Sequence, residues 1–299
     1  MNTKSAFITI AGKPNVGKSS LLNKLLGTKI AIVSSKPQTT RTKIMGVLTD
    51  GGIQLVFTDT PGFHRPHNKL GEIMNAAVKD SIGGTDAVLF VVEPKGELDP
   101  KELELIQKFK QEKIPTVLVI NKIDTLNDKT VLLSRLRELS GYCDFTAAVP
   151  VSAQTGEGIA DLMDEMKKLA VPSVHYFPDD TLTDQPERVI AAEIIREKIL
   201  RLMDKEVPHG IAVAIEKMRE RQDKEILDVD AVIYCERKSH KGIIIGKGGA
   251  MLKKIATAAR EELEAFLNCK VNLQCWVKVK EDWRNEERML RNFGFTEER

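Results

Sequence analysis

Cysteine is scarce in this chain, and the few cysteines present are not spaced as ligands or redox pairs. The four residues form no CxxC pair: Cys143, Cys235, Cys269 and Cys275. The sequence therefore lacks the cysteine spacing that is usual for a disulfide framework or for a thiolate zinc site. We expect reduced cysteines that pack in the interior.

Long apolar runs are also missing. The first ten residues, MNTKSAFITI, lack the basic head and apolar stretch of a signal peptide. The longest wholly apolar runs, such as AVLFVV, are too short to span a bilayer. We therefore expect a cytoplasmic protein.

The chain carries little net charge. Its 45 Lys and Arg residues almost balance 43 Asp and Glu residues, which leaves a formal charge of +2. Any contact with nucleic acid must therefore come from local clustering of charge. With 299 residues, 42% of them hydrophobic, the chain is long enough for two domains with separate cores.

The first part of the chain alternates between two patterns. Apolar runs typical of strands occur at residues 6–12, 52–59, 86–93, 116–121 and 147–152. Helical patterns occur between and after them at 18–26, 101–110, 132–139 and 159–169. This alternation predicts an α/β domain with a mostly parallel sheet covered by helices.

A proline-bearing stretch, VPSVHYFPDDTLTDQP, follows at residues 171–186 and predicts an interdomain linker. We expect Asp184 to cap a helix over residues 187–204. Two extended runs (210–220 and 226–237), a helix (250–267) and a strand (270–283) come next. The predicted boundaries are thus residues 1–172, a linker at 173–187 and a second, α+β domain at 188–299.

The best motif is a phosphate loop, GKPNVGKS, between the first strand and the first helix. It fits the pattern G-x-x-x-x-G-K-[ST], in which backbone amides surround a phosphate chain. We expect Lys18 to reach the β and γ phosphates and Ser19 to ligate Mg²⁺. The loop consists of Gly12, Lys13, Pro14, Asn15, Val16, Gly17, Lys18 and Ser19.

A second motif, DTPG, follows an apolar strand and comprises Asp59, Thr60, Pro61 and Gly62. The Asp59 carboxylate is expected to hold magnesium through water, and the Gly62 amide to sense the γ-phosphate.

A third motif, NKID, ends another strand and comprises Asn121, Lys122, Ile123 and Asp124. A carboxylate at this place accepts two hydrogen bonds from guanine, and adenine has no such pair of donors. Ser152 and Ala153 complete the set, because a backbone amide there is expected to reach the guanine O6.

These four motifs in this order resemble the translation-factor-related GTPases, and PNVGKSSLLN, PQTTR and DTPG resemble the Era-type branch. The resemblance implies GTP and GDP as ligands and Thr40 as a switch threonine that closes on magnesium, with Thr39 as its rival. Magnesium would then be held by Ser19, Thr40 and Asp59.

The resemblance also exposes a departure. Where many GTPases carry a glutamine that orients the attacking water, this chain has Phe63, so we expect slow intrinsic hydrolysis. Asn15 is a candidate for recruiting a potassium ion, as relatives with asparagine there do; the alternative is that it only shapes the loop. Lys18, Thr40, Gly62 and Asn15 are the expected catalytic residues, and Phe63 belongs to the nucleotide site.

A second glycine loop, GKGG at residues 246–249, lacks phosphate-loop spacing. With a helix on each side it resembles the loop of a type II KH domain, which clamps about four nucleotides of single-stranded RNA. Residues 237–260 contain seven Lys or Arg residues and no acidic residue, which suits phosphate contacts. The expected RNA-binding residues are Lys241, Gly246, Lys247, Gly248, Gly249, Lys253 and Lys254.

Three aromatic residues near the end could stack on bases: Trp276, Phe293 and Phe295. The alternation in CWVKVK instead favours an interior position for Trp276.

With both loops and the joining TDQPER, the resemblance to Era-type proteins covers essentially the whole chain: a mostly parallel P-loop GTPase domain plus an α+β type II KH domain. It implies a monomeric assembly GTPase of the small ribosomal subunit that binds the 3′ region of 16S rRNA and the 30S subunit. Peripheral contact with the inner face of the cell membrane is a further possibility.

Two alternatives remain open from the sequence. One is a regulatory GTPase at the membrane surface, with residues 237–260 bound to anionic lipid. The other is a plain binding module whose GTP site only stabilises the fold.

Overall fold

The computed structural model describes residues 3–36, 38–62, 66, 68–128, 130–203, 210–221 and 225–295. The chain forms two compact units. Unit 1 consists of Met1–Ala31, Thr40–Arg65 and Met74–Asp184. Unit 2 consists of Ile32–Thr39, Pro66–Ile73 and Gln185–Arg299.

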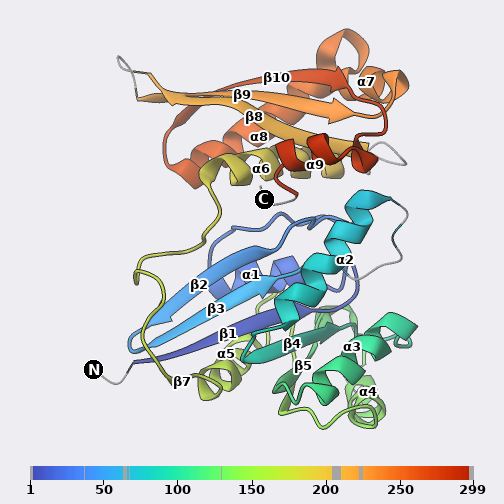
Figure 1. The fold of residues 1–299 in the computed structure, drawn as a ribbon, viewed down its shortest axis with the longest axis vertical. Helices are drawn as coiled ribbons and strands as arrows, with labels where there is room; N and C mark the ends of the chain where they lie inside the picture. Colours follow the sequence, from blue (N-terminus) through green and yellow to red (C-terminus); the bar gives the residue numbers. More distant parts are fainter. Residues whose placement is uncertain are drawn as a thin grey trace. The chain divides into compact units, whose positions relative to one another are not determined.

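Unit 1 is built around one sheet with strand order β2-β3-β1-β4-β5-β6 (Figure 1). All neighbours in this order are parallel except β2, which pairs antiparallel with β3, and β7 adds a short antiparallel pairing to β1. The strands are β1 (Lys4–Ala11), β2 (Ile44–Asp50), β3 (Ile53–Asp59), β4 (Ala87–Val92), β5 (Thr116–Ile120), β6 (Ala147–Pro150) and β7 (Val171–Pro172).

Helices cover both faces of this sheet. The helices are α1 (Lys18–Leu26), α2 (Lys69–Ile82), α3 (Pro100–Gln111), α4 (Thr130–Ser140) and α5 (Ile159–Lys168), with a 3₁₀ turn η1 (Ile123–Thr125). Apolar residues of α1 and α5 pack on one face, and residues of α2, α3 and α4 pack on the other. The central strand β4 is buried along its whole length, as expected for a strand covered on both sides.

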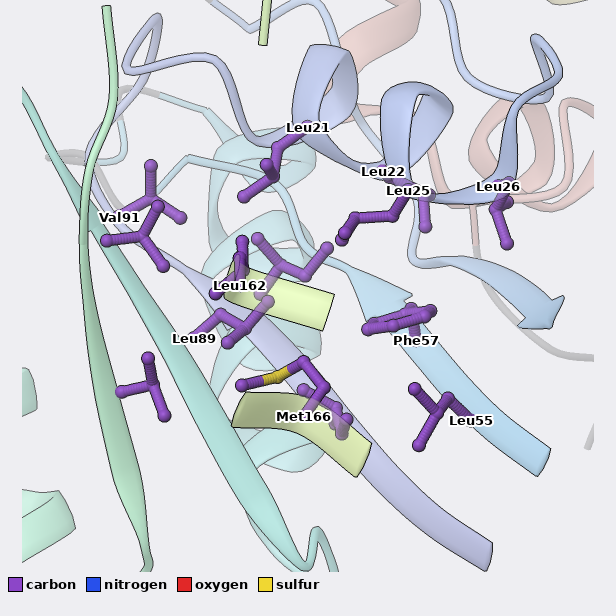
Figure 2. Close-up of a cluster of buried hydrophobic side chains, with 14 of the residues drawn as sticks. Leu21, Leu22, Leu25, Leu26, Leu55, Phe57, Leu89, Val91, Leu162 and Met166 are labelled. Atoms are coloured by element: carbon purple, nitrogen blue, oxygen red, sulfur yellow. The ribbon is translucent and has the colours of Figure 1, made fainter. Parts of the chain in front are cut away.

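Figure 2 shows the cluster on the α1 and α5 face. Leucines of α1 meet Leu55 and Phe57 of β3, Leu89 and Val91 of β4, and Met166 of α5. Burying these side chains in a close-packed layer fixes α1 on the sheet. This packing therefore also fixes the loop that precedes α1.

Unit 2 has a three-stranded sheet of order β10-β9-β8 with its apolar core on one face. β10 is parallel to β9, and β8 is antiparallel to β9. Its elements are α6 (Glu187–Leu202), β8 (Ile211–Glu220), β9 (Ile226–Cys235), α7 (Lys238–Ile245), η3 (Lys247–Gly249), α8 (Ala250–Leu267), β10 (Lys270–Val279), η4 (Trp283–Asn285) and α9 (Glu287–Asn292).

The predicted fold class, a mostly parallel α/β domain followed by an α+β domain, is confirmed by this architecture. In unit 1, β2, α2 and the two-residue strand β7 have no counterpart among the predicted elements, and in unit 2 the short helix α9 has none. β2 contains Gly46, and α2 contains Gly71 and Asn75, which are weak formers of strands and helices respectively. Pairing with β3 and packing on the sheet override these preferences.

The proline-bearing stretch is held by unit 1 through hydrogen bonds. Gln54 accepts the N–H groups of Tyr176 (2.8 Å) and Phe177 (3.0 Å) and donates to the Phe177 carbonyl (2.9 Å). Thr183 donates to the Met45 carbonyl (2.6 Å). The stretch is thus hydrogen-bonded to the sheet of unit 1 up to Thr183.

The predicted cap of α6 is wrong. The residue at the cap position is Pro186, which makes no side-chain cap hydrogen bond. Asp184 lies two residues further back, beyond the cap position. Proline, whose φ is fixed near the helical value, starts the helix instead.

Within the described part of the chain, no helix is long and apolar enough to cross a membrane.

Candidate nucleotide and nucleic-acid sites

Four loops of unit 1 meet at one edge of its sheet. The phosphate loop follows β1, DTPG follows β3, NKID follows β5, and Ser152 follows β6. Because these strands are parallel, their carboxyl ends lie at the same edge. In open α/β sheets this edge is where ligands bind.

The phosphate loop has backbone angles that most residues avoid. Gly12 and Gly17 have φ values of 151° and 99°, and Asn15 has a φ of 66°. A Cβ on Gly12 would lie 2.3 Å from the carbonyl oxygen of Val91. The loop leads into α1, whose first turn has neither a side-chain cap nor an acidic residue, so its N–H groups are available to an anion.

Lys18 lies at the start of α1 and is almost completely buried. Its Nζ donates to the carbonyl oxygens of Gly12 and Lys13, both at 3.0 Å. Desolvation lowers the pKa of Lys18 to about 8, and attraction to Asp59 only partly opposes this shift. A bound phosphate chain would supply the negative charge that the buried ammonium group lacks.

Three side-chain oxygens converge beside Lys18. Ser19 Oγ donates to Asp59 Oδ2 (2.6 Å), and Thr40 Oγ1 lies 2.8 Å from Ser19 Oγ and 3.4 Å from Asp59 Oδ2. In contrast, the hydroxyl of Thr39 donates to the Lys36 carbonyl (2.6 Å). The geometry thus favours Thr40 over Thr39 as the threonine of the metal site.

Asp59 is the least satisfied member of this group. It is fully buried, and among the described residues its Oδ1 has no hydrogen-bond partner. Desolvation raises the pKa of Asp59 to about 6, although Lys18, Ser19 and Thr40 all favour the charged form. Ser19, Thr40 and Asp59 together offer hard oxygen ligands, and one Asp59 oxygen still lacks a partner within the described chain, so the group fits Mg²⁺.

Gly62 of DTPG lies against the phosphate loop. A Cβ at this position would come within 2.6 Å of Pro14 Cα, so only glycine allows the approach. Phe63, which the sequence places in the same site, lies outside the described residues.

Asn121 connects three of the four loops. Its buried Nδ2 donates to the Val16 carbonyl (2.8 Å), and its Oδ1 accepts the Ala153 N–H (3.0 Å). A Cβ on Gly17 would lie 2.2 Å from Asn121 Nδ2. The glycine is therefore required for packing within the protein as well as for its backbone angle.

Asp124 is exposed at the mouth of the site, and one of its oxygens is oriented from within. Asp124 Oδ1 accepts the hydroxyl proton of Ser152 at 2.6 Å. From the sequence we expected a backbone amide of Ser152 or Ala153 to reach the guanine O6. In this structure the Ser152 N–H donates to the Glu157 carbonyl (2.9 Å) and the Ala153 N–H to Asn121. The hydroxyl contact was missed because side-chain geometry is not encoded in a two-residue motif.

The remaining NKID residues fix the turn. Lys122 has a φ of 66°, and its Nζ forms an ion pair with Glu93 at 2.5 Å. Ile123 is buried in the core. These contacts hold Asp124 at the sheet edge.

The second glycine loop connects α7 to α8 in unit 2. A Cβ on Gly246 would lie 2.7 Å from Met251 Cβ, so this glycine is needed for packing. Gly248 and Gly249 have φ values of 59° and 82°, and no atom lies within 4 Å of a Cβ built on either. The loop therefore presents open backbone to an incoming strand.

Most of the cationic side chains around this loop have no carboxylate partner in the part of the chain that the structure describes. Five exposed lysines lack an ion pair among the described residues: Lys238, Lys241, Lys247, Lys253 and Lys254. By comparison, Lys270, Lys278 and Lys280 after α8 are paired with Glu264, Glu216 and Glu286. Unpaired lysines beside open backbone are suited to phosphate groups.

The aromatic residues behave differently from the sequence expectation. Trp276 is 44% exposed, because it alternates away from the core face of β10. Trp283 is the buried tryptophan, and Phe293 and Phe295 pack on it at ring-centroid distances of 5.2 and 6.0 Å. The interior assignment of Trp276 is therefore wrong, and the two phenylalanines are engaged within the protein.

The four cysteines are free, but only Cys235 is buried, and Cys143, Cys269 and Cys275 are partly exposed, so the expected interior position is confirmed for Cys235 alone. No group of three or more His, Cys, Asp or Glu residues forms a metal cluster in the part of unit 1 and unit 2 that the structure describes.

Comparisons with known proteins support both sites. Residues 7–122 match the family model described as a 50S ribosome-binding GTPase, and residues 206–284 match that of the KH domain. The GTPase Era of Clostridioides difficile (strain 630) is 49% identical over 98% of this chain and 99% of its own length. The GTPase Era of Alkaliphilus metalliredigens (strain QYMF) is 46% identical over 99% of this chain and 100% of its own.

Two solved structures match with the same scores, 38% identity and a TM-score of 0.95, over 99% of this chain and 100% of theirs. One is an Aquifex aeolicus Era variant bound to GDP and AlF₄⁻. The other is Era in complex with MgGDPNP and nucleotides 1506–1542 of 16S ribosomal RNA. From the full-length identities, the chain belongs to the Era family of GTPases.

Proposed function

We propose that this chain hydrolyses GTP and binds the 3′ region of 16S rRNA in a nucleotide-dependent manner, as an assembly factor for the 30S subunit. The observation that carries the proposal is the presence of two glycine loops of different kinds. One has the buried Lys18 and an oxygen cluster beside it, and the other is surrounded by lysines that have no ion pair within the described part of the chain. The related Era structure with MgGDPNP and a 16S rRNA fragment supports this pairing of ligands.

At the nucleotide site, Lys18 exchanges its bonds to the Gly12 and Lys13 carbonyls for the β and γ phosphates. The Gly62 amide, held against Pro14, lies where it can contact the γ-phosphate. Ser19, Thr40 and Asp59 would hold Mg²⁺, which neutralises charge on the phosphates when bound. Asp124, oriented by Ser152, reads the guanine edge.

Asn15 has two proposed roles: shaping the phosphate loop and recruiting K⁺. Its φ of 66° is tolerated by asparagine better than by most residues, which supports a role in shaping the loop. Recruitment of K⁺ is the further proposal, and a comparison of hydrolysis in potassium and sodium salts at equal ionic strength distinguishes the two.

At the RNA site, Gly248 and Gly249 give the nucleic-acid backbone access to the protein backbone. Lys241, Lys247, Lys253 and Lys254 supply charge to the phosphates on either side of the loop. A lipid surface would need the lysines but not the open backbone, so the loop geometry favours RNA over the membrane-surface alternative. We place this activity in the cytoplasm and leave peripheral membrane contact as a secondary proposal.

The raised pKa of Asp59 predicts a pH dependence of nucleotide binding. Metal binding requires the ionised carboxylate, whose pKa in the nucleotide-free protein is about 6. Affinity for Mg²⁺–GTP should therefore be constant above pH 7 and fall by up to about tenfold per pH unit below pH 6. Calorimetric titration between pH 5 and 8 measures this, with Asp59→Asn as the control for titration of the nucleotide itself. The same slope in both proteins would contradict the assignment of Asp59.

Guanine recognition by Asp124 predicts a change of base preference. Asp124→Asn should lose about 3 kcal/mol of GTP binding free energy, because the new amide group offers a donor where guanine also has a donor. The variant should gain affinity for xanthosine triphosphate, because xanthine has an acceptor at that position. Ser152→Ala should weaken GTP binding by less, since it removes only the group that orients Asp124. Competition with fluorescent GDP measures both, and unchanged GTP affinity in Asp124→Asn would refute the role of NKID.

Close backbone approach at the second loop predicts sensitivity to bulk and negative charge. Gly248→Asp should weaken binding of a 16S 3′-end RNA by about 10- to 100-fold, the effect of losing one or two good contacts. Gly294→Asp is the matched control, because Gly294 also has a positive φ (74°) and open space around its Cβ position. Filter binding or fluorescence anisotropy at fixed salt measures both. Equal affinities of the two variants would contradict the RNA site.

A further inference from the structure

The end of β4 is the part of the proposed nucleotide site to which none of the four motifs gives a role. In the sheet of unit 1, β4 lies between β1, which leads into the phosphate loop, and β5, which leads into NKID. Neighbouring strands are about 4.8 Å apart, so the two loops begin about 10 Å apart, on either side of β4. A nucleotide that has its phosphates in one loop and its base at the other therefore crosses the end of β4.

Both loops contact this strand end. A Cβ on Gly12 would lie 2.3 Å from the Val91 carbonyl oxygen, so the phosphate loop starts against β4. On the other side, the Asn121 N–H donates to the Val92 carbonyl (2.9 Å). All of these residues belong to unit 1. Glu93, the next residue of the chain, is thus placed between the starts of the two loops.

Glu93 is joined to NKID by an ion pair. Lys122 Nζ donates to Glu93 Oε1 at 2.5 Å, and both side chains are partly exposed. In the register of β4 and β5, Val92 is opposite Ile120, so Lys122 lies just beyond the end of β5. The lysine side chain therefore extends from the end of β5 to the end of β4.

The backbone of Lys122 has an unfavourable conformation that its neighbours maintain. Its φ of 66° lies in the left-handed region that lysine seldom adopts. The Lys122 carbonyl accepts the N–H (3.0 Å) and the hydroxyl (2.7 Å) of Thr125. The Ile123 N–H donates to the Val151 carbonyl (3.2 Å). These bonds fix the direction in which the lysine side chain leaves the loop, and strained backbone of this kind is typical of functional sites.

The stability of the ion pair does not explain why this conformation is maintained. Exposed ion pairs contribute little to the free energy of unfolding, and both side chains here are in contact with water. What the pair does achieve is a fixed position for a long, flexible side chain. Ordering such a side chain before a ligand arrives removes an entropic cost of binding.

We infer that Glu93 is a positioning residue for the nucleoside part of GTP and GDP: it holds the Lys122 side chain across the end of β4, where the ribose and base pass between the phosphate loop and Asp124. The inference rests on the proposed nucleotide site. It extends that site to a residue that none of the four motifs contains.

The first test compares Glu93→Ala with the matched control Asp50→Ala. Asp50 forms a similar ion pair with Lys167 (2.6 Å), but at the opposite edge of the sheet, where β3 begins. Glu93→Ala should weaken binding of GDP and of a non-hydrolysable GTP analogue by the same factor, about two- to tenfold, the cost of ordering one long side chain. Asp50→Ala should change neither affinity. Equal effects of the two variants, or a loss for the analogue alone, would overturn the inference.

A second readout separates positioning from a general loss of structure. Urea unfolding without nucleotide should give Glu93→Ala and Asp50→Ala similar midpoints, since each variant loses one exposed ion pair. Glu93→Gln, which keeps an acceptor for the Lys122 ammonium group, should bind GDP more tightly than Glu93→Ala does. A midpoint of Glu93→Ala far below that of Asp50→Ala would show a structural role and overturn the inference.

A double-mutant cycle with Lys122→Met tests whether Glu93 acts through the lysine. Methionine keeps an apolar side chain but cannot pair with the carboxylate. Glu93→Ala should therefore have no further effect on GDP affinity in the Lys122→Met background. A loss of the same size in both backgrounds would show that Glu93 acts in another way and would overturn the inference.

Asp124→Asn keeps the inference apart from the function on which it rests. If Asp124→Asn leaves GTP affinity unchanged, the proposed nucleotide site is wrong and the role of Glu93 falls with it. If Asp124→Asn weakens GTP binding but Glu93→Ala weakens neither GDP nor the analogue, only the positioning role of Glu93 is overturned.

Discussion

Both proposed binding sites depend on one constraint: their loops need glycine, because the backbone takes angles or makes close approaches that a residue with a Cβ does not allow. In unit 1, a Cβ on Gly12 would collide with the Val91 carbonyl, and a Cβ on Gly17 would collide with the Asn121 side chain. In unit 2, Gly248 and Gly249 leave their outer side open. The glycines in the first loop therefore permit internal packing, whereas those of the second permit an external contact.

The treatment of charge separates the two sites in the same way. In the nucleotide site, Lys18 and Asp59 are buried, and desolvation shifts both pKa values toward the neutral forms. A ligand that carries its own phosphates and magnesium supplies the missing charge and so gains affinity. Around the second loop the lysines are exposed and form no ion pair with any residue that the structure describes, so the cost of desolvation is small and the attraction depends on salt. A chain of net charge +2 can thus bind two polyanions through local arrangements alone.

The sequence predicted the parts of this account that depend on local spacing. A phosphate loop between a strand and a helix, a DTPG after a strand and a GKGG between helices each define their own backbone geometry. Contacts between distant residues could not be predicted. Three contacts join residues that no motif spans: Asn121 with Val16 and Ala153, the Ser152 hydroxyl with Asp124, and the Val33 N–H with Glu197. Trp276 was misassigned because alternation alone does not say which face of a three-stranded sheet is covered.

The central claim is that the two loops act as one system. By linkage, if a nucleotide increases the affinity for RNA, then RNA must increase the affinity for that nucleotide by the same factor. Typical couplings correspond to about 5- to 150-fold. The most direct measurement is the affinity for a 16S 3′-end RNA with a non-hydrolysable GTP analogue, with GDP and without nucleotide, together with the analogue affinity with and without RNA. We predict tighter RNA binding in the analogue state and an equal, reciprocal gain in analogue affinity. Identical RNA affinities in all three states would show that the chain only tethers two independent binding sites.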